Sequence, residues 1–191
     1  EFAWKKSGWS LSAVDWGEGA GDFNDVVFDT NNHPIILYSN PVEQNPDMIG
    51  LWVRRSTDGG ETWEGYRLYE GRTSYRPDMK VHPQTGDIYV AFFNPTDGHA
   101  KLTILRNGDP FDQWSPAEDL GDNRYIEGEH PTIAFDQNGH LTLVYYRCVK
   151  ASRGSTCDPQ DDAVVFAWFV DNEWTYEIID NGEASPCGRF P

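Results

Sequence analysis

Hydrophobic positions fall in short runs separated by turns, and helical periodicity is nearly absent. Three segments align without gaps: Asn24–Asp29, Pro77–His82 and Pro131–Asp136. A turn follows each segment, and then a second apolar run: Ile35–Tyr38, Ile88–Ala91 and Leu141–Val144. Alternating or wholly apolar runs bounded by turns are typical of β-strands. The pattern therefore predicts three β-hairpins that repeat along the chain.

A recurring tryptophan extends each repeat and marks its fourth strand. The four positions are Trp9, Trp63, Trp114 and Trp174. Four strands in a period of roughly 50–60 residues are typical of the blades of a β-propeller. We therefore expect an all-β chain that forms one domain over residues 1–191 and is built of four-stranded antiparallel blades.

The phase of the repeat predicts where the blades begin and end. Residues 2–15 match a half-blade, and full blades are expected at 22–70, 75–121 and 129–180, with the start of another at 188–191. Propellers close with about 4–8 blades. The sequence thus predicts a partial propeller of about three and a half blades. The alternative is that several copies close one ring, since unpaired edge strands invite pairing with another chain.

The segment Ser56-Thr57-Asp58-Gly59-Gly60-Glu61-Thr62-Trp63 fits the pattern Ser-x-Asp-x-Gly-x-Thr-Trp. It resembles the Asp-box of the BNR (sialidase-like) β-propeller family. Glycine favours such turns, and Asp and Ser side chains can accept hydrogen bonds from the loop backbone. We expect a structural hairpin in which the tryptophan ring is buried. Its residues are Ser56, Asp58, Gly60 and Trp63, with a degraded copy at Asp109 and Trp114.

The resemblance implies a fold more than an activity. Sialidases of the family use an arginine cluster, a Tyr–Glu nucleophile pair and an acidic acid/base. Arg189-Phe190-Pro191 is similar to their Arg-x-Pro motif. Spacing does not choose between Tyr75 and Tyr125, or between Glu127 and Glu129, as a nucleophile pair. We therefore assign no catalytic residue.

Ligand-binding candidates come from the first strand of each blade, which lines the central channel of a propeller. By repeat alignment, the residues that begin these strands meet at one mouth of the channel. They include Asp22, Arg76, Glu129, His130 and Arg189. Arginine suits planar carboxylates, although these groups could instead neutralise one another in a salt-bridge ring. Trp16, in a loop between blades, is the candidate for an exposed ring that stacks on a sugar.

Charge and composition argue against several classes of binding partner. The chain has 191 residues and a formal net charge of −16, which argues against nucleic acid and against anionic membrane surfaces. No apolar run is long enough for membrane insertion. The acidic clusters Glu18–Asp25 and Asp158–Asp162 are possible Ca²⁺ loops. We expect no other cofactor and assign no metal ligand.

The three cysteines predict an oxidising compartment. Cys148 and Cys157 flank a polar loop, and a disulfide between them would close it. Disulfides persist outside the cytoplasm, so we expect an extracellular, cell-surface or periplasmic protein. Cys187 is left over, either paired outside this sequence or a buried thiol.

The sequence favours a non-catalytic binding or scaffold module whose channel-mouth loops meet a glycan or protein ligand. One alternative is a fragment of a sialidase-like glycoside hydrolase. Another is a structural module that closes its ring by oligomerisation. Further partners would then be the remaining blades of a parent chain or another copy of this one.

Overall fold

The computed structural model describes residues 2–5, 9–16, 20–41, 49–120, 126–148 and 162–180. Every regular element in these ranges is a β-strand. The strands are β1 (Phe2–Lys5), β2 (Trp9–Ser12), β3 (Asp22–Phe28), β4 (Pro34–Asn40), β5 (Gly50–Arg55), β6 (Glu64–Glu70), β7 (Ser74–Val81), β8 (Ile88–Asn94), β9 (His99–Leu105), β10 (Glu118–Asp119), β11 (Ile126–Phe135), β12 (Leu141–Cys148), β13 (Ala163–Val170) and β14 (Glu173–Asp180).

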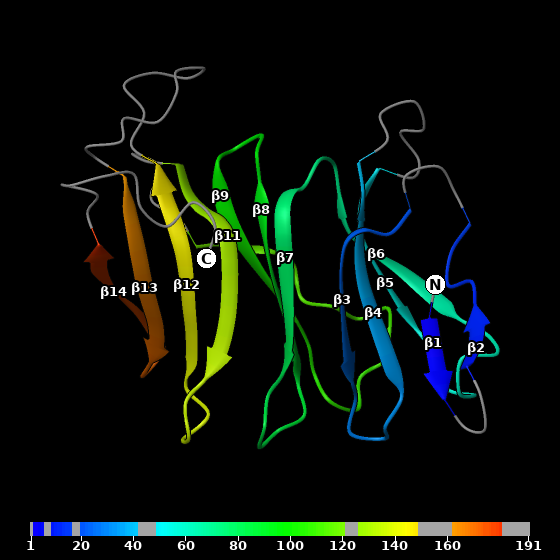
Figure 1. Ribbon diagram of the computed structural model, residues 1–191. Coiled ribbons are helices and arrows are strands. Elements are labelled where there is room, and N and C mark those ends of the chain that lie inside the picture. The colour runs from blue at the N-terminus through cyan, green and yellow to red at the C-terminus, as the bar shows by residue number, and fades with distance from the viewer. Residues whose placement is uncertain are drawn as a thin grey trace.

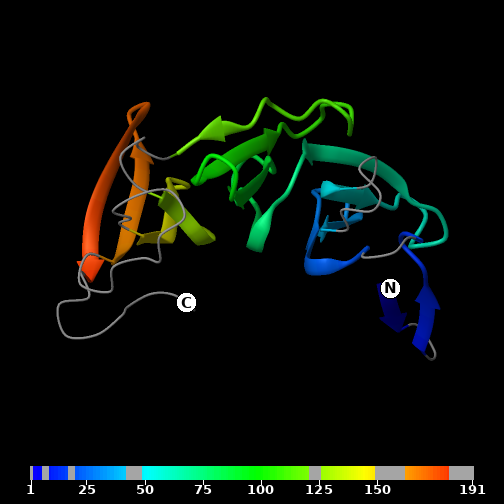
Figure 2. The same cartoon turned by 90° about the horizontal axis from the view of Figure 1, so that it is seen from above.

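The strands form three consecutive four-stranded antiparallel units, β3–β6, β7–β10 and β11–β14, preceded by the pair β1–β2. One parallel backbone pair, Glu127 with His99, joins the second unit to the third. Figure 1 shows β3, β7 and β11 side by side, and Figure 2 shows the units arranged as an open arc. The predicted all-β class and four-stranded blades are therefore confirmed, and we call the units the first, second and third blades.

The fourth strands are less regular than the tryptophan pattern predicts. Trp63 lies directly before β6, and Trp114 lies in a loop before β10, which has only two residues. The loop that precedes β10 is held to β9 by Ser115, whose backbone N–H donates to Ile104 O at 2.9 Å. The next residue is Pro116, which has no N–H to continue a ladder. The fourth strand of the second blade is therefore short.

The hydrophobic cores lie between blades. Along β8, Ile88, Val90 and Phe92 belong to the core shared with the first blade, whereas Ala91 belongs to the core shared with the third. Successive side chains of a strand point to opposite faces. A middle strand of a blade therefore needs apolar residues on both of its faces. This explains why the second strand of each blade is a continuous apolar run.

Carboxylates join the innermost strands of neighbouring blades. Asp25 Oδ2 in β3 accepts a hydrogen bond from the backbone N–H of Met79 in β7, at 3.0 Å. Asp78 Oδ2 in β7 accepts one from Ile133 in β11, at 2.7 Å. Asp25 and Asp78 occupy the same position of the repeat, as do Met79 and Ile133. The bond is therefore a repeated structural link between blades.

The loop that carries the Asp-box pattern is closed by its own side chains. Asp58 Oδ1 accepts bonds from the backbone N–H groups of Glu61 and Thr62, at 3.0 and 2.9 Å, and from the Ser56 hydroxyl at 2.8 Å. The Thr62 hydroxyl donates to Asp58 Oδ2 at 2.6 Å. These bonds, above all those from Thr62, hold the pKa of Asp58 well below its usual range. The carboxylate is thus engaged by its own turn.

The two tryptophans of the repeat differ in burial. Trp63 is half-buried, and its Nε1–H donates to Ser12 Oγ in the preceding sheet at 3.3 Å. Trp114 is buried and belongs to the core between the first and second blades. The expectation of a buried indole is therefore wrong for Trp63, whose ring lies against the two-stranded sheet β1–β2.

The link between inner strands can be tested at Asp78. Asp78→Ala leaves the N–H of Ile133 without its acceptor, so we expect a loss of about 1–3 kcal/mol in the free energy of unfolding. Asp78→Asn keeps an oxygen acceptor and should lose less. Urea denaturation followed by tryptophan fluorescence measures both. Glu177→Gln, on the exposed strand β14, is the control. Equal stability of wild type and Asp78→Ala would show that the link contributes nothing.

The depressed pKa of Asp58 predicts a pH dependence. A carboxylate whose pKa is lowered on folding contributes stability above its unfolded pKa of about 3.9, and this stability is lost as pH falls through the folded value. We expect Asp58→Asn to lower the melting temperature at pH 7, and the difference from wild type to shrink on acidification. Thermal unfolding by circular dichroism between neutral pH and pH 2 measures this.

The control for this experiment is Asp109→Asn at the equivalent position of the second blade. There Gln113 stands in place of Thr62, so the threonine hydroxyl that bonds Asp58 is absent. Its melting temperature should follow that of the wild type throughout. A constant difference between Asp58→Asn and wild type across the pH range would contradict the prediction.

Candidate functional site

The pairing of each innermost strand shifts register, as at a β-bulge, at the same point of the repeat. The pairing of β3 with β4 shifts between Asp22 and Asp25, and that of β7 with β8 shifts between Ser74 and Asp78. The pairing of β11 with β12 shifts between Glu129 and Thr132. Bulges re-aim side chains and are common beside active sites. The three bulges lie at the upper ends of β3, β7 and β11 in Figure 1.

Two bulge residues have a backbone conformation that side chains other than glycine rarely adopt. Phe23 has a φ of 46° and His130 a φ of 55°. These residues are equivalent in the repeat, and Arg76 is the third member of the set. Such positions cost about 1–3 kcal/mol and concentrate at functional sites. We therefore take this end of the inner strands as the candidate site, and name it the channel mouth, defined by Asp22, Phe23, Arg76, Glu129 and His130.

The structure brings most of the predicted residues to the channel mouth. Asp22 and Arg76 are exposed, His130 is half-buried and Glu129 is buried, at 5% exposure. Arg189 lies outside the described residues. Among the described residues, Arg76 takes part in none of the ion pairs. Its guanidinium is thus available to a ligand, whereas Glu129 lies beneath the surface.

A buried polar pair lies beside Glu129. On β12, Tyr146 is the backbone partner of Glu129, and its hydroxyl donates a hydrogen bond to Asp162 Oδ2. Tyr146 and Asp162 are 1% and 2% exposed. Sequence analysis placed Asp162 in a possible Ca²⁺ loop, Asp158–Asp162, and missed its pairing with Tyr146. The signal in the sequence was an acidic residue directly before an apolar third strand, because a buried carboxylate needs a hydrogen-bonding partner.

Trp16 is fully presented to solvent, at 85% exposure, on the loop between β2 and β3. Its backbone N–H donates to Asp15 Oδ1 at 2.8 Å. Asp15 Oδ2 accepts from the Tyr38 hydroxyl and pairs with Arg54 Nη2 at 3.0 Å. Burial opposes ionisation of Asp15, but the bonds from Tyr38 and Arg54 outweigh it and lower its pKa. The loop that carries Trp16 is thus anchored by a partly buried ion pair.

The remaining candidates concern metals and cysteines. Within the described ranges, no group of three or more His, Cys, Asp or Glu residues is placed to hold a metal ion. The candidate Ca²⁺ loops at Glu18–Asp25 and Asp158–Asp162 lie partly outside those ranges.

Cys148 takes part in a disulfide. Cys157 and Cys187 lie outside the described residues, so the pairing of Cys148 with Cys157 stays a prediction. No described helix is long and apolar enough to cross a membrane.

Comparison with known proteins supports the fold. No family model and no curated protein matches this sequence. Among solved structures, the chain is similar to the α-L-arabinofuranosidase Arb93A from Fusarium graminearum, solved with an iminosugar inhibitor. The TM-score is 0.53 at 13% identity, and the match covers 88% of this chain and 50% of that one. At this identity the likeness shows a β-propeller fold and nothing finer.

A second similar structure is the endo-arabinase from Bacteroides thetaiotaomicron, at 17% identity and a TM-score of 0.47. That match covers 75% of this chain and 54% of the endo-arabinase, and is too weak to carry an argument. This chain thus spans about half the length of both structures. Both are β-propeller glycoside hydrolases, whereas membership of the BNR family stays a prediction.

The positive φ at Phe23 gives a test of the bulge. Asparagine tolerates this conformation and a β-branched residue does not. We expect Phe23→Asn to keep the wild-type stability, and Phe23→Val to lose about 1–2 kcal/mol, as measured by urea denaturation. The control is Phe28→Val on the same strand, which is also half-exposed, at 49%, and should change little. Equal stabilities of the two Phe23 variants would argue against the strained bulge.

Proposed function

We propose that this chain is the glycan-binding part of an extracytoplasmic β-propeller and that the ligand binds at the channel mouth. The observation that carries the proposal is the bulge repeated at the start of three adjacent inner strands. It holds Phe23 and His130 at positive φ and leaves Asp22 and Arg76 exposed. Backbone strain of this kind concentrates at functional sites, and here it recurs at the same end of two inner strands.

The chemistry of the channel mouth suits a sugar. Phe23 is 43% exposed and offers an aromatic ring to the apolar face of a pyranose or furanose. The Arg76 guanidinium and the Asp22 carboxylate offer planar donors and acceptors for vicinal hydroxyl groups. An arginine also suits a carboxylate on an acidic sugar. The α-L-arabinofuranosidase of similar architecture, whose name gives it a glycan substrate, favours a glycan over a protein ligand.

A second candidate function is glycoside hydrolysis. It is favoured by two carboxyl groups, Glu129 and Asp162, buried in the third blade near the channel mouth. Most glycosidases use a pair of carboxyl groups, one as acid and one as base or nucleophile. The similar arabinofuranosidase lends support through its activity. We place this function second because Asp162 already accepts the Tyr146 hydroxyl.

The proposal also includes a cellular location, binding partners and two additional ligand-binding candidates. An extracellular, cell-surface or periplasmic location agrees with the disulfide at Cys148. The binding partners would be a glycan and the further blades of a longer chain or of another copy. Ca²⁺ is an additional candidate ligand of the acidic loops, and Trp16 a candidate for a stacking ring at the edge of the site.

Binding is tested on a glycan array, followed by calorimetry with the glycan that binds best. Arg76→Ala should weaken binding about tenfold or more, since hydrogen bonds from a charged group contribute about 1.5–3 kcal/mol. Arg76→Lys should recover little of this loss, because lysine lacks the planar fork. Phe23→Ala should also weaken binding. Ile178→Ala, an equally exposed apolar position on β14, should not.

The same samples separate binding from hydrolysis. Arabino-oligosaccharides are incubated with the protein, and new reducing ends are measured. Binding without turnover identifies a binding module. Turnover that disappears in Glu129→Gln, while binding persists, identifies the hydrolase. If no glycan binds and none is cleaved, the proposal is wrong.

A further inference from the structure

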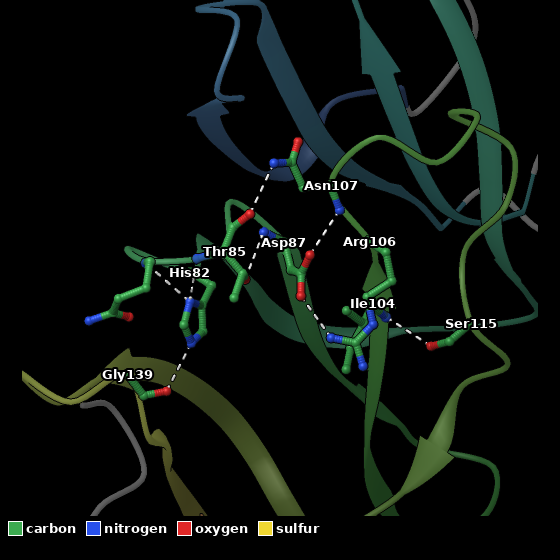
Figure 3. Close-up of polar contacts among 9 residues, drawn as sticks. His82, Thr85, Asp87, Ile104, Arg106, Asn107, Ser115 and Gly139 are labelled. Carbon is green, nitrogen blue, oxygen red and sulfur yellow. Dashed lines mark hydrogen bonds and ion pairs between the residues drawn. The ribbon is translucent and has the colours of Figure 1, made fainter.

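The turns that join β3 to β4, β7 to β8 and β11 to β12 lie at the lower edge of Figure 1, opposite the channel mouth, and we call this side the hairpin face. Between the second and third blades this face is closed by His82. Its ring meets Phe135 edge-on, with centroids 4.8 Å apart, and its Nε2 lies 3.0 Å from Gly139 O. The backbone N–H groups of Gln84 and Thr85 point at His82 Nδ1 (Figure 3), so Nδ1 is the acceptor and Nε2–H the donor.

The equivalent junction between the first and second blades is open. Repeat alignment places Asp29 where the next blade has His82, and Val81 where the third blade has Phe135. A carboxylate cannot donate to a carbonyl, so Asp29 cannot form the closing bond. It instead accepts the N–H groups of Asn31 and His33, at 2.9 and 2.8 Å. The smaller Val81 leaves unfilled the volume that a phenylalanine would take.

A groove occupies this junction. It has a volume of about 390 Å³ and adjoins a second hollow of about 210 Å³. The two share Asp29, Gly86 and Asn107 in their walls. We call them together the hairpin-face groove. Their combined size falls in the range of small-molecule binding sites.

The walls of the hairpin-face groove are fixed before any ligand arrives. The Asn107 amide donates to Thr85 O at 3.0 Å, and its Oδ1 accepts the Thr30 hydroxyl at 3.1 Å. Asn107 N donates to Asp87 Oδ1 at 2.8 Å, as Figure 3 shows. A Cβ at Gly86 would lie 2.3 Å from the Thr30 methyl, so the hairpins are in close contact there. A preorganised site binds at a lower entropic cost.

The lining chemistry is polar, and its two arginines are already paired. Arg55 pairs with Glu64 and Arg106 with Asp87, so Asp29 and Asp109 add acceptor oxygens to the wall of the smaller hollow. The side chains of Asn31 and Asp109 make no hydrogen bond with any other described residue. Amides, hydroxyls and carboxylates match the hydroxyl groups of a neutral ligand, which can donate to these oxygens, better than they match phosphate, which the carboxylates would repel. No described group of three or more His, Cys, Asp or Glu residues here could hold a metal ion.

From this we infer a second binding site, the hairpin-face groove, which takes a neutral polyhydroxylated ligand of the oligosaccharide class. It is formed by the first and second blades alone. It does not rest on the function proposed for the channel mouth, because the two sites lie at opposite ends of the inner strands.

The groove is tested by titrating arabinohexaose, xylohexaose and cellohexaose into ¹⁵N-labelled protein. The Arg76→Ala background is used so that the channel mouth contributes little. We expect at least one of the three to shift the amide signals of Asn31, Gly86 and Asn107. Asn31→Ala removes a side chain that makes no hydrogen bond with any other described residue. It should raise the dissociation constant for the oligosaccharide about five- to tenfold, as expected for one lost hydrogen bond.

Val81→Phe copies the residue of the closed junction and should fill the groove and abolish these shifts. The control is Asn138→Ala, at the same turn position of the third blade as Asn31, which should leave binding unchanged. The inference is wrong if none of the three oligosaccharides shifts these signals. It is equally wrong if Asn31→Ala binds as tightly as Asn138→Ala, even should Val81→Phe fail to fold.

Discussion

The fold depends on how neighbouring inner strands satisfy their backbone groups. Strands that fan out from a common axis cannot form a regular ladder with each other, yet a buried N–H without an acceptor is costly. Asp25 and Asp78 solve this by reaching across to the N–H groups of Met79 and Ile133. One carboxylate in each of the first two blades thus links its inner strand to the inner strand of the next blade.

Those cores lie between blades, so the burial of a blade depends on its neighbour. Met79 and Ile133 are 0% and 1% exposed, each packed toward the blade before it. Val26, the equivalent residue of the first blade, is 49% exposed because the described sheet before it has only two strands. An apolar residue at the same repeat position is therefore core or surface according to the neighbouring sheet.

The two ends of the inner strands differ in their physical design. At the channel mouth, bulges place Phe23 and His130 in a strained backbone conformation. At the hairpin face, turns are held by aspartates that accept the N–H groups of the turn backbone, as at Asp29 and Asp136. The positive-φ residues of these turns are Asn32 and glycines, which tolerate that conformation. Binding at the first end would use strain already present in the backbone, whereas binding at the second would use a space that the repeat leaves unfilled.

The sequence by itself determined the strands, their grouping into blades and the closed turn at Asp58. These features depend on local periodicity and on turn chemistry, which a single repeat already expresses. It also predicted that Asp22, Arg76, Glu129 and His130 lie at one end of the inner strands, because aligned repeats place equivalent residues at equivalent heights.

Only the tertiary structure decided which of these groups are exposed, where backbone strain occurs and which carboxylates are already engaged. It showed Glu129 buried and Arg76 open to solvent, and it placed Asp162 against Tyr146. It also showed that the junction beside Val81 is open while the one beside Phe135 is closed. Such properties arise from contacts between residues far apart in the chain, and the spacing of residues along one repeat does not encode them.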